Sequence, residues 1–126
     1  METSESKGER IAMSDTIIYD FAKKFTPNPG LRFKSMTPGI SGEDFREQVL
    51  EPLFKNNQKI IIDVSGIEGN LGSSFLSESF GTIATIYGID KFNELIDFDK
   101  TTPKGRITYE EMKKRVEEAL KKAGKK

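Results

Sequence analysis

The stretch that most constrains the fold is residues 59–87, which run without interruption from a strand through a glycine-rich turn into a helix. Residues 60–64 read Ile-Ile-Ile-Asp-Val, a β-branched run that predicts a central strand covered on both faces. Residues 66–72 then supply three glycines, which allow positive φ values and close approach of the backbone to another group. We therefore expect any binding site of this protein to lie in this stretch.

A helix is predicted over residues 73–87. Ser73 and Ser74 are candidate N-caps, and Gly88 is suited to end the helix. Its apolar residues recur at helical spacing and predict a stripe that packs on the sheet, formed by Phe75, Leu76, Phe80, Ile83 and Tyr87.

The N-terminal third predicts a hairpin and then a helix. Two extended segments, 15–25 and 31–35, flank the dipeptide Pro29-Gly30, which fits the centre of a type II turn. Residues 41–44, Ser-Gly-Glu-Asp, resemble a capping box and predict a helix start, with Pro52 disturbing the helix near its end.

The C-terminal third predicts a strand, a loop and a helix. Residues 92–99 contain Leu95, Ile96 and Phe98 and predict the strand, and residues 99–106 predict the loop. Thr108 opens a second capping box, from which we expect a helix to continue to residue 124.

Together these elements predict an α/β fold with a small four-stranded mixed sheet and about three helices packed beside it. Residues 15–124 are expected to form one domain, preceded by a disordered tail at 1–14 and followed by a basic tail at 125–126. The chain has no His and no Cys, which excludes thiolate or imidazole zinc sites, Ser-His-Asp and Cys-His nucleophile systems, and disulfides.

Charge and hydropathy narrow the classes of partner. Twenty basic and twenty acidic residues balance, so we expect no DNA binding driven by a global positive field. No apolar run approaches the ~20 residues of a membrane span, and the N-terminus METSESKGER does not resemble a signal peptide. We therefore expect a cytoplasmic protein without a membrane partner.

The segment GSSFLSESFG, residues 72–81, resembles the signature of the STAS-like family of bacterial and phage-borne domains of unknown function, whose core reads close to GSSFLEEAFG. Two upstream motifs extend the resemblance. FTPNPGLR, residues 25–32, is similar to the family's proline-glycine hairpin, and SGEDFR, residues 41–46, is similar to its helix start. The likeness spans residues 16–99.

The resemblance implies a fold similar to that of sulfate-transporter and anti-sigma-factor-antagonist domains. In the better understood relatives, a serine kinase related to histidine-kinase ATPases phosphorylates the first serine of a D-S-S-G turn. By this resemblance Ser73 and Ser74 match the two serines, while Gly72 and Phe75 stand where the relatives have Asp and Gly. The resemblance thus implies a non-enzymatic regulatory module that docks a histidine-kinase-like ATPase or similar regulator, with serine phosphorylation as a switch.

The glycine-rich loop and helix start are the candidate site. A helix N-terminus offers free N–H groups and a positive dipole end, which suit a phosphate or an acidic partner group. A tight strand-to-helix turn also requires glycines for its own geometry, and the spacing matches neither standard nucleotide-binding motif. The expected contact residues are Gly69, Asn70, Gly72, Ser73, Ser74, Phe75, Ser77 and Glu78.

A second candidate lies at the end of the central strand. Asp63 with Glu68 is expected to line a ligand crevice, because carboxyl ends of strands in open α/β sheets face the usual binding site. We expect no cofactor, no metal and no enzymatic activity. The alternative function is a small-molecule or nucleotide-binding sensor or sequestering protein, encoded by a phage or another mobile element.

Overall fold

The computed structural model describes residues 16–124, so the predicted tails at 1–14 and 125–126 lie outside the described residues. Three strands, β1 (Ile17–Asp20), β2 (Ile60–Asp63) and β3 (Ile96–Phe98), form a parallel sheet in the order β1-β2-β3. Ile60 of β2 pairs with Ile17 and with Ile96, so the isoleucine run is the central strand, as predicted. The prediction of four strands in a mixed sheet is wrong for the described residues.

The predicted hairpin over residues 15–35 is also wrong. β1 passes directly into a helical turn, α1 (Phe21–Lys24), and the Asp20 carboxylate accepts a hydrogen bond from the Lys23 N–H at 3.2 Å. This turn places Phe21 and Phe25 with their ring centroids 5.4 Å apart in the core. Burial of these two rings outweighs the weak strand alternation.

The segment after α1 forms a loop. Gly30 does not adopt the positive φ that a type II turn requires, and its N–H instead donates to the Ile40 carbonyl at 2.8 Å. A Cβ at Gly30 would collide with Thr37, so the absence of a side chain permits this closure. The loop returns the chain to the helix that begins after Ser41.

The first long helix is present as predicted, in three consecutive segments: α2 (Gly42–Phe45), the π-helical η2 (Arg46–Leu50) and α3 (Glu51–Lys55). The Ser41 hydroxyl accepts a bond from the Asp44 N–H at 3.0 Å, and the Asp44 carboxylate accepts one from the Ser41 N–H at 3.2 Å. This confirms the capping box. The widened π segment lies directly ahead of Pro52, whose ring would crowd the carbonyl of a regular preceding turn.

The central helix consists of α4 (Ser73–Leu76), the π-helical η3 (Ser77–Gly81) and α5 (Thr82–Tyr87). Its predicted apolar stripe is buried, apart from the partly exposed Tyr87. Gly88 ends it with φ of 94°, as predicted. The predicted N-cap is wrong, because Gly72 is the N-cap residue, without a side-chain cap, and Ser73 is the first helical residue.

Two more helices follow, α6 (Ile89–Leu95) and α7 (Pro103–Lys122). The strand predicted over 92–99 is therefore confined to β3, and α7 begins before the predicted capping box at Thr108. Thr102 is its N-cap and accepts a bond from the Gly105 N–H at 3.1 Å, with Pro103 at the first helical position. The described chain thus has five helical units (α1, 42–55, 73–87, α6 and α7) where three were predicted.

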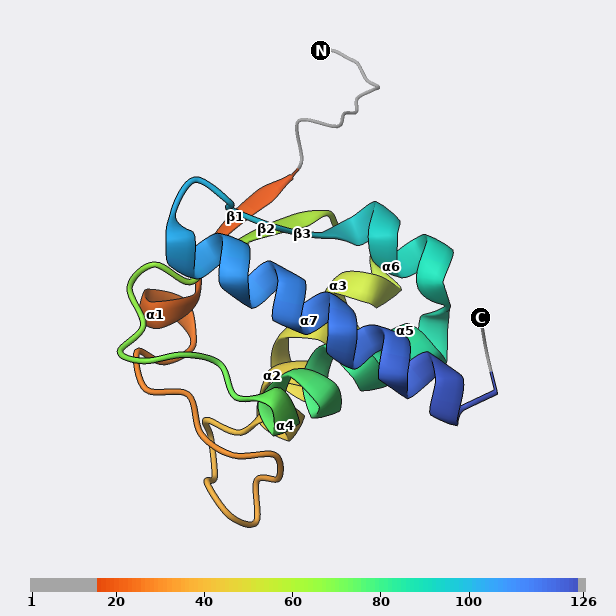
Figure 1. Cartoon of the computed structure of the whole chain (residues 1–126), viewed down its shortest axis with the longest axis horizontal. Helices are drawn as coiled ribbons and strands as arrows, with labels where there is room; N and C mark the ends of the chain where they lie inside the picture. Colours follow the sequence, from red (N-terminus) through yellow and green to blue (C-terminus); the bar gives the residue numbers. More distant parts are fainter. Residues whose placement is uncertain (1–15, 125–126) are drawn as a thin grey trace.

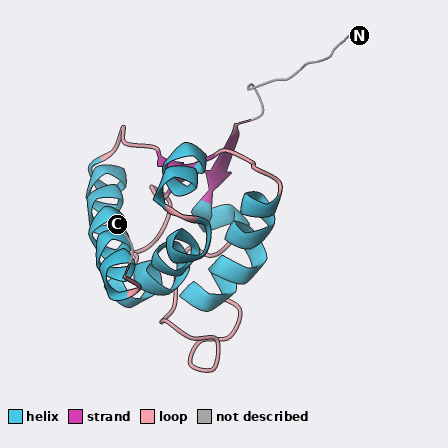
Figure 2. Ribbon diagram, turned by 90° about the vertical axis from the view of Figure 1, so that its right-hand side faces the viewer, coloured by secondary structure: helices cyan, strands magenta, loops and turns pink. Residues whose placement is uncertain are grey.

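The longer helices gather on one side of the sheet (Figures 1 and 2). The inner face carries Tyr19, Ile60, Ile62 and Phe98, each at most 9 % exposed. Beneath it lies an aromatic cluster in which Phe45 is 5.1 Å from Phe21 and 5.7 Å from Phe80, between ring centroids. On the opposite face Ile18 is 62 % exposed, so the prediction that both faces are covered is wrong for the outer face.

Candidate functional site

The glycine-rich loop that follows β2 is held at several points. Ile67 and Leu71 are buried, and the Lys104 ammonium at the start of α7 donates to the Ile67 carbonyl at 2.6 Å. The Glu68 N–H donates to the Pro27 carbonyl at 2.8 Å, which joins this loop to the loop after α1. Between these anchors the backbone turns through Gly69, which has φ of 92°. The loop therefore presents an exposed tip on a well-anchored base.

The predicted contact residues fall into two groups. Gly69, Asn70, Gly72 and Ser73 are exposed, whereas Ser74 and Ser77 are partly buried. Phe75 is 0 % exposed and belongs to the core. The structure therefore leaves the loop tip and Ser73 accessible, and turns Phe75 away from any partner.

Glu78, the last predicted contact residue, is engaged by two arginines. Its carboxylate lies 3.2 Å from the Arg46 guanidinium and 3.8 Å from that of Arg32. Arg46 also bonds Glu51 at 3.0 Å, and the side chains of Arg46 and Glu78 are 14 % and 15 % exposed. This network joins the central helix to the first long helix and to the loop of Arg32. The Glu78 carboxylate is therefore part of the contacts that hold these three segments together.

The two carboxylates expected to line a ligand crevice lie in different surroundings. Asp63 is partly buried at the end of β2 and accepts a bond from the Ser65 N–H at 2.9 Å, while Glu68 is exposed on the loop. Within residues 16–124 no group of three acidic side chains is placed to hold a metal ion. Asp63 thus shapes the turn after β2.

Sequence reasoning missed a set of exposed apolar side chains on the loop after α1. Leu31, Phe33 and Met36 are 50 %, 43 % and 59 % exposed, and the Arg32 guanidinium lies 5.9 Å from the Phe33 ring centroid. The prediction of an extended segment over residues 31–35 did not indicate that these side chains are exposed. The available signal was three large apolar residues inside a Pro- and Gly-rich segment that favours a loop.

The loop that carries these side chains is joined to the glycine-rich loop by the bond between Glu68 and Pro27, and to the central helix by the ion pair between Arg32 and Glu78. We call the combined region the loop surface and define it as Leu31, Phe33, Met36, Gly69, Asn70, Gly72 and Ser73. It combines apolar contact area with exposed backbone and with the exposed Ser73, which is a composition suited to protein contact.

Comparison with known families identifies a match over the middle of the chain. Residues 41–106, just over half of the chain, match the model of the STAS-like domain of unknown function (DUF4325). Searches of curated proteins and of solved structures found no match to this chain. In the described range 16–124, no helix combines the length and the apolar character needed to cross a bilayer.

Proposed function

Because this chain belongs to the family of STAS-like domains of unknown function, we propose that it is a non-enzymatic regulatory module that docks a partner protein through the loop surface. The partner class indicated by the family resemblance is a histidine-kinase-like ATPase or a similar regulator. The observation that carries the proposal is the pairing of an exposed, well-anchored glycine loop with three exposed apolar side chains.

Two physical features favour docking at this surface. Its anchors, Ile67 and Leu71 in the core and the Glu68 to Pro27 bond, limit the conformational entropy that binding would cost. Phe33 and Met36 supply apolar area of the kind that dominates binding energy once a partner excludes water. The neighbouring carboxylates of Glu78 and Asp63 are already engaged, which favours a contact role over acid–base chemistry.

Phosphorylation of Ser73 is the proposed switch. Ser73 is exposed at the first position of the central helix, where a kinase can reach its hydroxyl. A phosphate there adds roughly 1.5 to 2 negative charges beside the positive end of the helix dipole, so the fold tolerates it. The same charge lies within the loop surface, and it changes docking by altering the surface that the partner meets.

The test combines purified components with surface variants. The protein is mixed with a purified histidine-kinase-like ATPase and ATP, and complex formation is measured by size-exclusion chromatography while phosphoserine is located by mass spectrometry. We expect a complex and modification at Ser73. Phe33→Ser and Ser73→Glu should weaken the complex, whereas Ile86→Ser, at an exposed isoleucine on α5 outside the loop surface, should leave it unchanged.

Two results would contradict the proposal. The first is the absence of both complex and phosphoserine across a panel of such ATPases. The second is equal weakening by Phe33→Ser and by Ile86→Ser, since this would remove the loop surface from the contact. A nucleotide panel in a thermal-shift assay separates the alternative, because a ligand at 100 times its Kd should stabilise the fold by ≈ 2.7 kcal/mol.

A further inference from the structure

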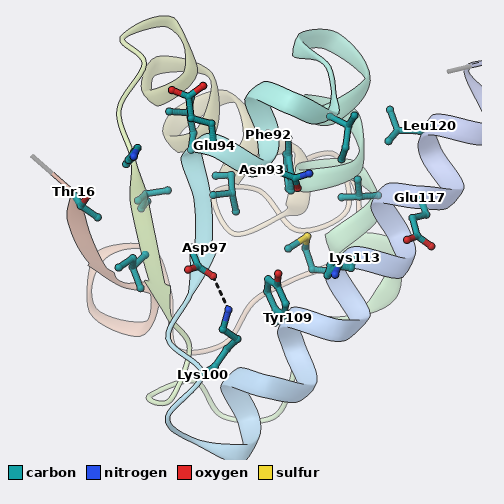
Figure 3. A pocket seen from close by; sticks show the side chains of 18 residues that line it. Thr16, Phe92, Asn93, Glu94, Asp97, Lys100, Tyr109, Lys113, Glu117 and Leu120 are labelled. Carbon is teal, nitrogen blue, oxygen red and sulfur yellow. Dashed lines mark hydrogen bonds and ion pairs between the residues drawn. The ribbon is translucent and has the colours of Figure 1, made fainter. Parts of the chain in front are cut away.

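The two edges of the parallel sheet differ in what lies beside them. The strand order is β1-β2-β3, so β1 and β3 are the edge strands of the described sheet. β3 lies beside α7, with a cavity of about 750 Å³ between β3, α6 and α7, whereas β1 lies on the side of the sheet away from α7 (Figure 3). An uncovered edge strand offers its N–H and carbonyl groups to a further strand, so the state of each edge indicates where one can pair.

The edge of β3 offers no free donor. The Asp99 N–H donates to the Ile62 carbonyl of β2 at 2.9 Å, so the N–H groups of Ile96 and Phe98 face away from β2. Both are already bonded, that of Ile96 to the Phe92 carbonyl and that of Phe98 to the Asp97 carboxylate at 2.8 Å. A further strand would therefore find no free N–H group on this edge.

The edge of β1 is available. The Ile17 N–H donates to the Lys59 carbonyl at 3.0 Å, on the side of β2. Alternate residues of a strand direct their backbone groups to the same side, so the N–H and carbonyl of Ile18 face the other way. No residue within the described range 16–124 bonds either group. Apolar area lies beside them, since Ile17 and Ile18 are 38 % and 62 % exposed.

The sequence of this edge is complementary to itself when two copies run antiparallel. If Ile18 lies opposite Ile18 of a second copy, Ile17 lies opposite Tyr19 and Thr16 lies opposite Asp20. This register pairs all of residues 16–20 and places apolar side chains opposite each other without a pair of like charges. A register centred on Asp20 would instead place two carboxylates opposite one another, which is unfavourable.

We propose that β1 pairs antiparallel with β1 of a second copy of this chain, with Ile18 on the two-fold axis. The Ile18 N–H and carbonyl of each copy then bond the same groups of the other copy, and the two sheets of three strands join into one of six. The outer edges of the joined sheet are the two β3 strands, which have no free donor among their described residues, so assembly stops at the dimer. The paired segment is short, so we expect dimerisation to depend on protein concentration.

The first experiment uses the absence of cysteine from the chain. In a hydrogen-bonded antiparallel pair, the Cα atoms of opposite residues lie about 5.5 Å apart, which a disulfide can span. Ile18→Cys in the full chain, oxidised with diamide, should therefore give mostly a disulfide-linked dimer on a non-reducing gel. Ile107→Cys is the matched control, because Ile107 is 65 % exposed on α7, and it should stay mostly monomeric under the same conditions.

The second experiment measures the mass of the unmodified chain by sedimentation velocity over a wide range of protein concentrations. We expect the mass to rise from that of one chain to that of two and no further. Ile18→Lys should weaken dimerisation at least about tenfold, because it places two like charges opposite each other at the edge. Ile107→Lys should leave dimerisation unchanged. Circular dichroism checks that both variants keep the fold, which we expect because both positions are exposed.

Three results would overturn the proposal. The first is a monomer at every concentration, which would mean that another segment or another protein covers this edge. The second is equal cross-linking of Ile18→Cys and Ile107→Cys. The third is a dimer that Ile18→Lys does not weaken, since such a dimer would form through a different surface. None of these substitutions lies in the loop surface, so the outcomes are distinct from those of the docking test.

Discussion

The two faces of the sheet differ more than their sequences suggest. Ile61 and Ile62 are neighbours in β2 with the same side chain, yet Ile62 is 0 % exposed against the helices and Ile61 is partly exposed on the outer face. In the adjacent strand, Ile18, the partner of Ile61 in the register, is 62 % exposed. The comparison teaches that a continuous apolar run identifies a central strand but does not say how many of its faces are covered.

The difference follows from where the helices lie. Parallel sheets usually have helices on both faces. Here the helices over residues 42–55 and 73–87 and helix α7 all lie on the side of the inner face (Figure 1). The outer face carries Ile18 and Ile61 together with Asp63 and Asp97. One face therefore holds the core together, and the other is available to solvent or to a partner.

The largest expected change in stability comes from comparing isoleucines on the two faces of the sheet. Ile62→Ala removes a fully buried side chain and should lower the free energy of unfolding by about 2–5 kcal/mol, since it leaves a cavity in the core. Ile18→Ala removes an exposed side chain and should change it by less than about 0.5 kcal/mol. Urea denaturation measures both; similar losses would mean that the outer face is covered as well.

The second prediction concerns how α7 closes over the inner face. A Cβ at Gly105 would collide with the Asp99 carbonyl oxygen, so Gly105→Ala forces the helix start away from β3. We expect a loss of about 1–3 kcal/mol in the free energy of unfolding, although alanine favours helix formation. Ile107→Ala, at a 65 % exposed position two residues further on, is the control. A neutral Gly105→Ala would show that α7 can shift without loss of core packing.

The smallest expected effect is a dependence of stability on pH, caused by Tyr19 on the inner face of the sheet. Burial raises the pKa of Tyr19 from its usual 10.0 to about 12. The unfolded chain therefore loses this proton first, and the stability contributed by the neutral phenol is present below pH 10 and lost as pH rises toward 12. Tyr19→Phe should reduce this alkaline loss in denaturation curves recorded between pH 9 and 12. An unchanged alkaline profile would indicate that the Tyr19 phenol is accessible to water.

Local chemistry predicted several elements correctly. The β-branched run of β2, the capping box of Ser41 and Asp44, and the end of the central helix at Gly88 each depend on a few adjacent residues. The errors arose where distant contacts decided. α1 forms because Phe21 and Phe25 meet Phe45 in the core. The start of α7 is a local error of another kind, since its N-cap Thr102 and Pro103 lie in the segment that was assigned to a loop.

The candidate site was predicted only in part. Glycine spacing identified the exposed loop tip, and the position of Ser73 followed from the helix start within one residue. The burial of Phe75 and the pairing of Glu78 with Arg32 and Arg46 were not predictable, because they depend on residues that are distant in the chain. The exposed side chains of Leu31, Phe33 and Met36 likewise became visible only when the loop was placed.

The sequence by itself determined the central strand, the glycine turn, the two long helices around the capping box and the GSSFLSESFG segment, and the membership in the STAS-like family, because these depend on residue types at short spacing. The tertiary structure alone decided that the described sheet has three parallel strands with one open face, that the two loops are hydrogen-bonded to each other, and that a cavity remains between β3 and α7. Each of these depends on which side of the sheet the helices pack. Local backbone preferences carry no information about that choice, since it is decided by the shape and burial of side chains that meet only after folding.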